Sequence, residues 1–183
     1  QISGYVTFAD GRMNAAVWDS PNARASVVGA PATSLFSGGG AGGMMAGYQY
    51  HNYVGFNDIE AMVWTETDGT VALGTLGASP GPGASFPKEY SNARDLNISG
   101  VVVGYSSAPD GERAFWWTKE SGMSSLTDLA GGKVFSRARS INNIGQVVGF
   151  GSDDVGMKAV LWNSVSGEAI DLNSYVSPNL GWV

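Results

Sequence analysis

Two stretches, "ARDLNISGVVVGY" (residues 93–105) and "ARSINNIGQVVGF" (residues 138–150), align with each other without a gap. Both open on an Ala-Arg pair, place an asparagine shortly before a glycine, and close on a glycine followed by an aromatic residue. Shorter versions of the same ending occur at "ISGY" (residues 2–5) and "YVGF" (residues 53–56). The chain therefore repeats one unit, and we expect a fold that is an array of its copies.

A second marker follows each of these endings, namely a short apolar run that begins with alanine and ends with tryptophan. The runs are "AAVW", "AMVW", "AFWW" and "AVLW", and they end at Trp18, Trp64, Trp117 and Trp162. These tryptophans lie 46, 53 and 45 residues apart (64 − 18, 117 − 64 and 162 − 117). The aromatic residues of the first marker lie 51, 49 and 45 residues apart (56 − 5, 105 − 56 and 150 − 105).

Two independent markers that share one period divide the chain into units. A single repeat domain, residues 1–183, is predicted, with approximate units at residues 1–43, 44–92, 93–137 and 138–183. Structural repeat positions are expected at the four tryptophans and at Gly4, Gly55, Gly104 and Gly149.

Each unit has the pattern of four short antiparallel strands. In the last unit the expected strands are residues 138–142, 146–151, 158–163 and 168–172, joined by turns that contain glycine. The strands that end in tryptophan are apolar without alternation, which indicates that neighbouring sheets cover both of their faces. Stacked four-stranded sheets with a repeat of 45–53 residues predict an all-β fold, a β-propeller of about four repeats, with a β-solenoid as the alternative.

The stretches "ARSINNIGQVVGF…KAVLWNSVSGEAIDLN" and "ARDLNISGVVVGY…RAFWWTKESGMSSLTDLAGG" resemble the bacterial extracellular repeat family called HAF. Residues 93–173 carry the resemblance, whereas residues 1–92 match only at the Gly-aromatic and Ala-x-x-Trp positions. The resemblance implies a secreted or surface β-propeller of bacteria. It transfers no catalytic residue to this chain, because the family motif is structural.

Composition limits the function classes. The chain has 183 residues, of which 43% are hydrophobic and 14% charged, with 27 glycines and no cysteine. Much glycine, many aromatic residues and few charges are typical of an all-β protein with many turns. The net charge of −6 and only ten Lys and Arg argue against nucleic-acid binding. No apolar run approaches the ~20 residues that span a bilayer, so no membrane insertion is expected.

The sequence offers little for catalysis or metal binding. His51 is the only histidine, and most carboxylates occur at expected turns, where Asp usually bonds to the backbone. Asp153 and Asp154 lack the pattern of a calcium loop. The stretch "GGGAGG" (residues 38–43) is interpreted as a loop rather than a dinucleotide motif. We expect no catalytic residue, no metal and no cofactor.

Aromatic residues give the only candidate binding positions. Tyr48, Tyr50 and Tyr53 alternate along "YQYHNY", and Trp116 adjoins Trp117 on the opposite face of its strand. Such rings can stack on sugars, while packing between sheets is the alternative interpretation. The leading hypothesis is a secreted or cell-surface structural or binding module. The alternatives are a carbohydrate-binding, lectin-like propeller and a polysaccharide-active propeller enzyme, with Asp95 and Asp171 as its strand-borne carboxylates.

The first unit, which opens on "QISGY", lacks the strand that precedes the Gly-aromatic strand elsewhere. An unpaired sheet edge is therefore expected. Residues 180–183 could pair there, or a neighbouring subunit could supply the strand and produce oligomers or filaments. The expected partners are thus further copies of the chain and, on the alternative hypothesis, glycans.

Overall fold

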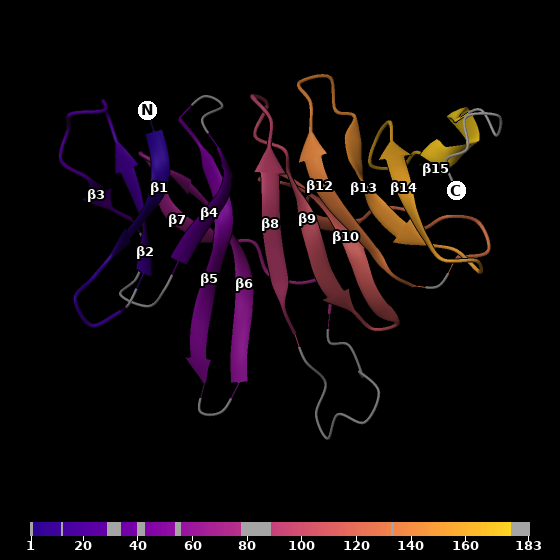
Figure 1. Cartoon of the computed structure of the whole chain (residues 1–183), viewed down its shortest axis with the longest axis horizontal. Coiled ribbons are helices and arrows are strands. Elements are labelled where there is room, and N and C mark those ends of the chain that lie inside the picture. Colours follow the sequence, from indigo (N-terminus) through magenta and orange to yellow (C-terminus); the bar gives the residue numbers. More distant parts are fainter. Residues whose placement is uncertain are drawn as a thin grey trace.

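A computed structural model describes residues 2–11, 13–28, 34–39, 43–53, 56–77, 89–132 and 134–176. These residues form an all-β structure of four antiparallel sheets, arranged in sequence order along the long axis of the molecule (Figure 1). Each sheet packs on the next one, and the first and fourth sheets lie at opposite ends. Within the described residues, no helix is long or apolar enough to cross a membrane.

Every sheet is a meander, in which each strand pairs with the one that follows it. The first sheet contains β1 (Ile2–Thr7), β2 (Met13–Trp18) and β3 (Ser26–Val27). The second contains β4 (Ser34–Gly39), β5 (Met45–Tyr53), β6 (Phe56–Thr65) and β7 (Gly69–Ala72). The third contains β8 (Ser91–Leu96), β9 (Val102–Ala108), β10 (Gly111–Thr118) and β11 (Gly122–Ser125). The fourth contains β12 (Ser136–Ile141), β13 (Val147–Ser152), β14 (Met157–Trp162) and β15 (Ala169–Asp171), followed by the 3-10 helix η1 (Leu172–Tyr175).

The pairing register shows which positions are equivalent in the four sheets. The four repeated tryptophans occupy the last or the last but one position of the same strand in their sheets. Trp18, Trp64, Trp117 and Trp162 pair with Ile2, Met45, Val102 and Val147. Two residues further along the paired strand stand Gly4, Gly47, Gly104 and Gly149, each followed by an aromatic residue. The repeat seen in the sequence is therefore a repeat of strand register.

The second sheet departs from the register expected from the sequence. Gly47 and Tyr48 occupy the Gly-aromatic position, whereas Tyr53 pairs with Phe56 at the tip of the β5–β6 hairpin. Gly55, which the sequence pattern placed in the repeat, lies outside the described residues. The physical reason is that β5 and β6 are longer than their counterparts, so Phe56, the aromatic residue of the expected pair, lies at the opposite end of the hairpin from Trp64.

The unit boundaries also differ from those expected. Because β4 pairs with β5, a boundary between residues 43 and 44 falls inside the second sheet. The second, third and fourth sheets instead begin at Ser34, Ser91 and Ser136. The interpretation of "GGGAGG" as a loop is wrong for its first two glycines, which belong to β4.

Side chains of β10 fill the spaces on both sides of the third sheet. Ala114 and Trp116 pack against the fourth sheet in one apolar cluster, together with Trp162. Phe115 and Trp117 pack against the second sheet in another cluster. The prediction that strands ending in tryptophan lie between two sheets is thereby confirmed for β10.

Close backbone contact explains the repeated glycine. A Cβ atom at Gly104 would lie 2.0 Å from the Asn92 carbonyl oxygen, and one at Gly149 would lie 2.0 Å from the Arg137 carbonyl oxygen. Both glycines face a β-bulge in the first strand of their sheet, at Arg94 in β8 and at Arg139 in β12. The bulge brings the neighbouring backbone against the glycine, so no side chain fits there.

A buried serine links each of the last two sheets to the sheet before it. The Ser91 hydroxyl accepts the Ala61 N–H (2.9 Å) and donates to the Gly74 carbonyl (2.6 Å). The Ser136 hydroxyl accepts the Ala114 N–H (3.0 Å) and donates to Asp128 (2.9 Å). The hydrogen bonds of these serines fix the position of each of the two sheets relative to the sheet before it.

We therefore expect Ser136→Ala to destabilise the protein by about 1–3 kcal/mol, because it leaves a buried N–H and a carboxylate oxygen without their partner. The measurement is urea unfolding followed by tryptophan fluorescence. Ser125→Ala, at an exposed position in β11, is the matched control and should change the free energy of unfolding by less than about 0.5 kcal/mol. Equal effects of the two substitutions would contradict the linking role.

Candidate functional site

Arginine and aromatic side chains occur on neighbouring strands of the second, third and fourth sheets. A ring contact joins Tyr48 to Tyr50 in β5, and cation–π and ring contacts join β9, β12 and β13. The strand β8, which carries Arg94, packs against both β5 and β12. These side chains, called here the arginine–aromatic row, are Tyr48, Tyr50, Arg94, Tyr105, Phe135, Arg137, Arg139 and Phe150.

The row begins with a pair of tyrosines. The rings of Tyr48 and Tyr50 meet edge to face, with centroids 5.6 Å apart and planes at 74°. Both side chains are half-buried. Burial is the largest cause that raises the pKa of Tyr48, and the positive charge of Arg94 acts in the opposite direction. Tyr48 therefore remains neutral at physiological pH.

Arg137 occupies the middle of the row and is held on three sides. Its guanidinium lies 4.2 Å from the ring centroid of Tyr105 and 5.4 Å from that of Phe135. Its Nε and Nη2 donate to the two oxygens of Glu112, at 2.5 and 3.1 Å. Burial alone would lower the pKa of Arg137, but the hydrogen bond and charge of Glu112 outweigh it and raise this pKa. Arg137 is thus a fixed cation that is already paired.

Glu112, the carboxylate partner of Arg137, is only 8% exposed, and hydrogen bonds occupy both of its oxygens. Besides Arg137, it accepts a hydrogen bond of 2.8 Å from the Tyr90 hydroxyl. Burial, followed by this hydrogen bond, raises the pKa of Tyr90. A buried carboxylate that binds one guanidinium and one phenol is a structural anchor, because both of its oxygens are occupied.

Arg94 and Arg139 differ from Arg137 because they have no carboxylate partner in the described part of the chain. They stand at the two equivalent bulges of β8 and β12, where the chain has one residue more than its partner strand. The Arg139 guanidinium lies 5.0 Å from the ring centroid of Phe150. Phe150 in turn lies 6.1 Å from Phe135, which closes the row.

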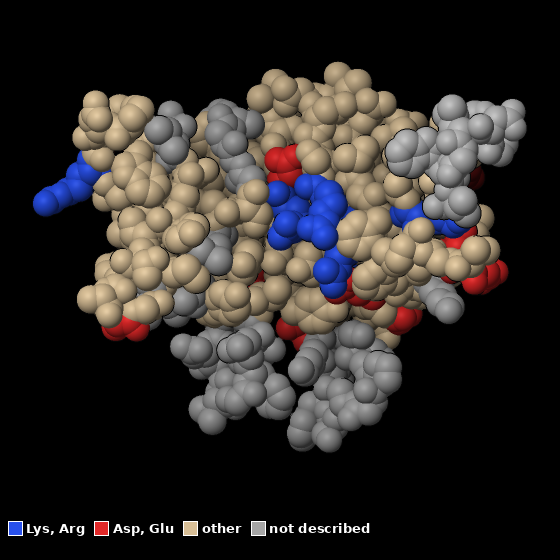
Figure 2. Space-filling view, viewed as in Figure 1, with Lys and Arg blue, Asp and Glu red and all other residues tan. Residues whose placement is uncertain are grey.

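The row forms a positive patch on an otherwise acidic protein. Figure 2 shows blue side chains gathered at the middle of one face, over β8 and β12, with mostly uncharged surface around them. The chain as a whole has a net charge of −6. The patch is therefore suited to an anionic ligand with apolar faces.

The binding residues proposed from the sequence lie in different parts of the structure. Tyr48 and Tyr50 belong to the row, whereas the side chain of Tyr53 lies outside the described residues. Trp116 packs between the third and fourth sheets, where its ring lies 3.4 Å from the position of a Cβ on Gly145. Tyr48 is also the repeat aromatic of the second sheet, so a structural role explains its presence as well.

Sequence reasoning missed the arginines of the row. Arg94 and Arg139 follow alanine in the two aligned stretches, and this shared Ala-Arg pair was the available signal. Because charged residues in repeats are usually placed at the solvated surface, the pair alone did not indicate a site. Only the pairing register, with a bulge at each arginine, gives them a common position, and Arg139 in addition contacts the Phe150 ring.

The strand-borne carboxylates make structural contacts. Asp95 accepts hydrogen bonds from the Ser140 hydroxyl (2.6 Å) and the Ile141 N–H (3.0 Å), which joins the third sheet to the fourth. Asp171 accepts the Asn173 N–H (2.8 Å) at the start of η1. Across the described residues, no group of three or more His, Cys, Asp or Glu side chains is placed to hold a metal ion.

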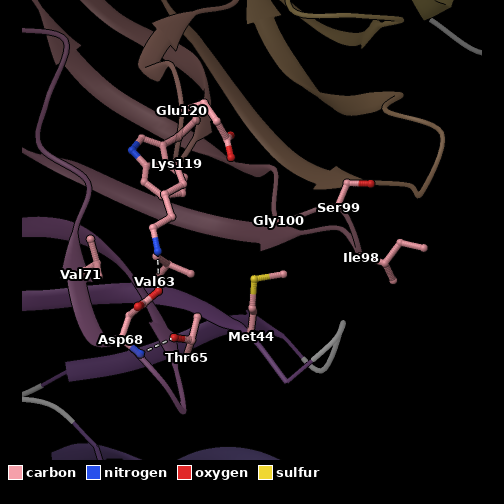
Figure 3. A pocket seen from close by; sticks show the side chains of 11 residues that line it. Met44, Val63, Thr65, Asp68, Val71, Ile98, Ser99, Gly100, Lys119 and Glu120 are labelled. Carbon is pink, nitrogen blue, oxygen red and sulfur yellow. Dashed lines mark hydrogen bonds and ion pairs between the residues drawn. The ribbon is translucent and has the colours of Figure 1, made fainter.

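A cavity of about 260 Å³ opens between the second and third sheets (Figure 3). Its base is apolar, with Val63 and Trp117, and an ion pair of 2.7 Å between Lys119 and Asp68 crosses its rim. This hydrogen bond raises the pKa of Lys119. Because both charges are paired and the volume lies below the ~300–1,000 Å³ of small-molecule sites, the cavity is a weaker candidate than the row.

No family model, curated protein or solved structure matches the chain. Its function is therefore argued from the geometry of the row and from the two sheets at the ends of the molecule.

Proposed function

We propose that this chain is a β-propeller-type repeat protein that serves as a structural and binding module outside the bacterial cell, and that its copies associate head to tail. Four consecutive meander sheets, with β8 packed against both β4 and β12, support the propeller arrangement. The observation that carries the proposed association is the complementarity of the two end sheets.

The fourth sheet has an apolar outer face that is covered only in part, since Leu161 and Ile170 are half-buried and Val148 is exposed. Val148 pairs with Leu161, and Leu161 pairs with Ile170, so the three side chains share this face. Val148 is 41% exposed. Its equivalent in the third sheet, Val103, is 0% exposed because the fourth sheet packs on it. The outer face thus carries the residues that pack between sheets elsewhere in the molecule, but no sheet among the described residues packs on it.

The first sheet presents the opposite half of the same contact. Its Trp18 occupies the position of Trp117, which is 8% exposed because it packs against the preceding sheet. Trp18 itself is only half-buried. In addition, β1 is the edge strand of the first sheet and, among the described residues, pairs only with β2. Residues 180–183, expected as a possible partner strand, lie outside the described residues.

Within the chain, the packing of one sheet on the next occurs three times, between the first and second, second and third, and third and fourth sheets. The two end faces carry the residues of the two halves of this same contact. A second copy that places its first sheet on the fourth sheet of the first copy would reproduce this interface. Such head-to-tail association is heterologous and extends into a filament unless its rotation closes a ring. The resemblance of residues 93–173 to extracellular repeats supports the proposed location and the absence of a catalytic role.

The test is sedimentation velocity over a range of protein concentrations. We expect the average mass of the parent chain to rise with concentration and Leu161→Glu to remain a single copy, because the new charge would be buried in the interface. Ile98→Glu also introduces a carboxylate in place of an apolar side chain, at a 60% exposed position of the third sheet that lies outside both end faces, and should associate like the parent. A parent chain that stays monomeric at every concentration would refute head-to-tail association.

A further inference from the structure

We propose that the arginine–aromatic row binds an acidic polysaccharide, with Arg94 and Arg139 pairing with carboxylates on the sugar chain. This inference names a ligand for the binding module proposed above, and it does not depend on association between copies. It rests on the contacts of the two arginines, on the spacing of the row and on the charge balance of the chain.

The first argument is the state of the guanidinium groups. Arg113 contacts Asp110 and Asp128, and Arg137 contacts Glu112, so these two arginines are internally paired. Arg94 and Arg139 have no such ion pair in the part of the chain that the structure describes. Arg139 is held against the Phe150 ring, at 5.0 Å from its centroid. An arginine fixed by an aromatic ring keeps its planar N–H groups available for a carboxylate.

The second argument is periodicity. Arg94 and Arg139 occupy the same bulge position in neighbouring sheets, so the fold presents the same charge twice in adjacent repeats. A polymer with a carboxylate on each sugar residue also presents its charges at regular intervals. A repeated arginine is therefore suited to an extended polyanion, and binding at two positions raises the overall affinity.

The third argument is the aromatic end of the row. The half-buried rings of Tyr48 and Tyr50 lie edge to face in β5, and β5 packs against β8, the strand that carries Arg94. Aromatic rings contact the apolar faces of sugars, and tyrosine adds a hydroxyl group for hydrogen bonding. A ligand that combines carboxylates with sugar faces uses both parts of the row, whereas a simple inorganic anion uses only the arginines.

The charge balance disfavours nucleic acid as the polyanion. Binding to a phosphate backbone draws on many clustered Lys and Arg, and this chain has ten in total against 16 Asp and Glu. The positive patch of Figure 2 is confined to the middle of one face. A short positive patch on a protein with a net charge of −6 matches sparse carboxylates better than dense phosphates.

The experiment is isothermal titration calorimetry at low salt with polygalacturonate as the probe. The fully methyl-esterified polymer keeps the sugar backbone and removes its charge. A single-stranded oligonucleotide keeps regular negative charge but replaces the carboxylates with phosphates and the pyranose chain with pentoses and bases. Titrations use the Leu161→Glu variant as the parent, so that binding is measured on single copies whatever the outcome for association. We expect binding to polygalacturonate that weakens with added salt, and at least tenfold weaker binding to the other two probes.

The variants are Arg94→Gln and Arg139→Gln, each of which should weaken binding by about tenfold, as expected for the loss of a charge-assisted hydrogen bond. Arg24→Gln is the matched control: it makes the same charge change at an exposed arginine between β2 and β3 and should leave the affinity unchanged. Arg139→Lys keeps the charge but loses the planar donor group, and should fall between the parent and Arg139→Gln. Circular dichroism checks that every variant is folded.

Three results would overturn the proposal. One is an equal loss of affinity in Arg24→Gln, which would indicate a general effect of charge. Another is equal binding of the esterified polymer. The third is tighter binding of the oligonucleotide, which would identify the row as a nucleic-acid surface instead.

Discussion

Replacing Gly104 with alanine is expected to lower the free energy of unfolding by about 3 kcal/mol or more. The added methyl group would lie 2.0 Å from the Asn92 carbonyl oxygen and 2.9 Å from a ring carbon of Phe115. The first of these atoms belongs to the backbone of β8, so it cannot move unless the β8–β9 pairing opens. Because Phe115 is fully buried, the ring has no space to withdraw either.

Chemical denaturation measures this loss, and Gly4→Ala is the comparison at the equivalent position of the first sheet. There the new Cβ would approach only the ring of Trp18, at 3.2 Å, and that ring is half-buried and able to shift. Gly149→Ala should reproduce the large effect, since its Cβ would lie 2.0 Å from the Arg137 carbonyl oxygen. Similar stabilities for the Gly4 and Gly104 variants would show that the bulge is not what selects glycine.

Trp162→Ala is expected to cost about 3–5 kcal/mol, the usual range for removing a large buried aromatic side chain. Trp162 is 0% exposed and packs in the cluster between the third and fourth sheets. Its indole N–H donates a hydrogen bond of 2.7 Å to the Thr127 carbonyl oxygen. The substitution therefore creates a cavity and removes a contact between the two sheets at once.

Two further variants separate these contributions in the same unfolding measurement. Trp162→Phe keeps most of the apolar contact but removes the donor, so its cost should be about 1–3 kcal/mol. Trp18→Ala removes a half-buried ring and should cost less than Trp162→Ala. If Trp18→Ala and Trp162→Ala were equally destabilising, burial within the array would not determine the effect of each repeated tryptophan.

The sequence pattern predicted the all-β class and the equivalence of the four tryptophans in strand register. It succeeded because the apolar runs ending at Trp117 and Trp162 have to fill the space between sheets, which fixes residue type and spacing together. The same pattern misplaced the second repeat. Two Gly-aromatic pairs occur within β5 and its hairpin, and only the pairing partners of Trp64 identify the first of them as the repeat position.

The candidate site was predictable only in part. Tyr48 and Tyr50 were found because alternation along one strand is a local pattern. Arg137 and its contacts with Tyr105 and Glu112 join residues of different sheets, and no local pattern reports such contacts. For Trp116 the sequence left ring stacking on sugars and packing between sheets both open, because sequence cannot tell which face of a strand the next sheet covers; the structure places it in the packing between the third and fourth sheets.

Among the described strands, the main contacts between sheets join consecutive sheets, which gives the molecule the character of a one-dimensional chain of cooperative units. An internal sheet is stabilised by two neighbours, while a terminal sheet has one, so opening starts at the ends and spreads inward. Association through the end faces would give each terminal sheet its second neighbour. The local stability of the first and fourth sheets would then follow the law of mass action, and the concentration of the protein itself would set how often its ends open.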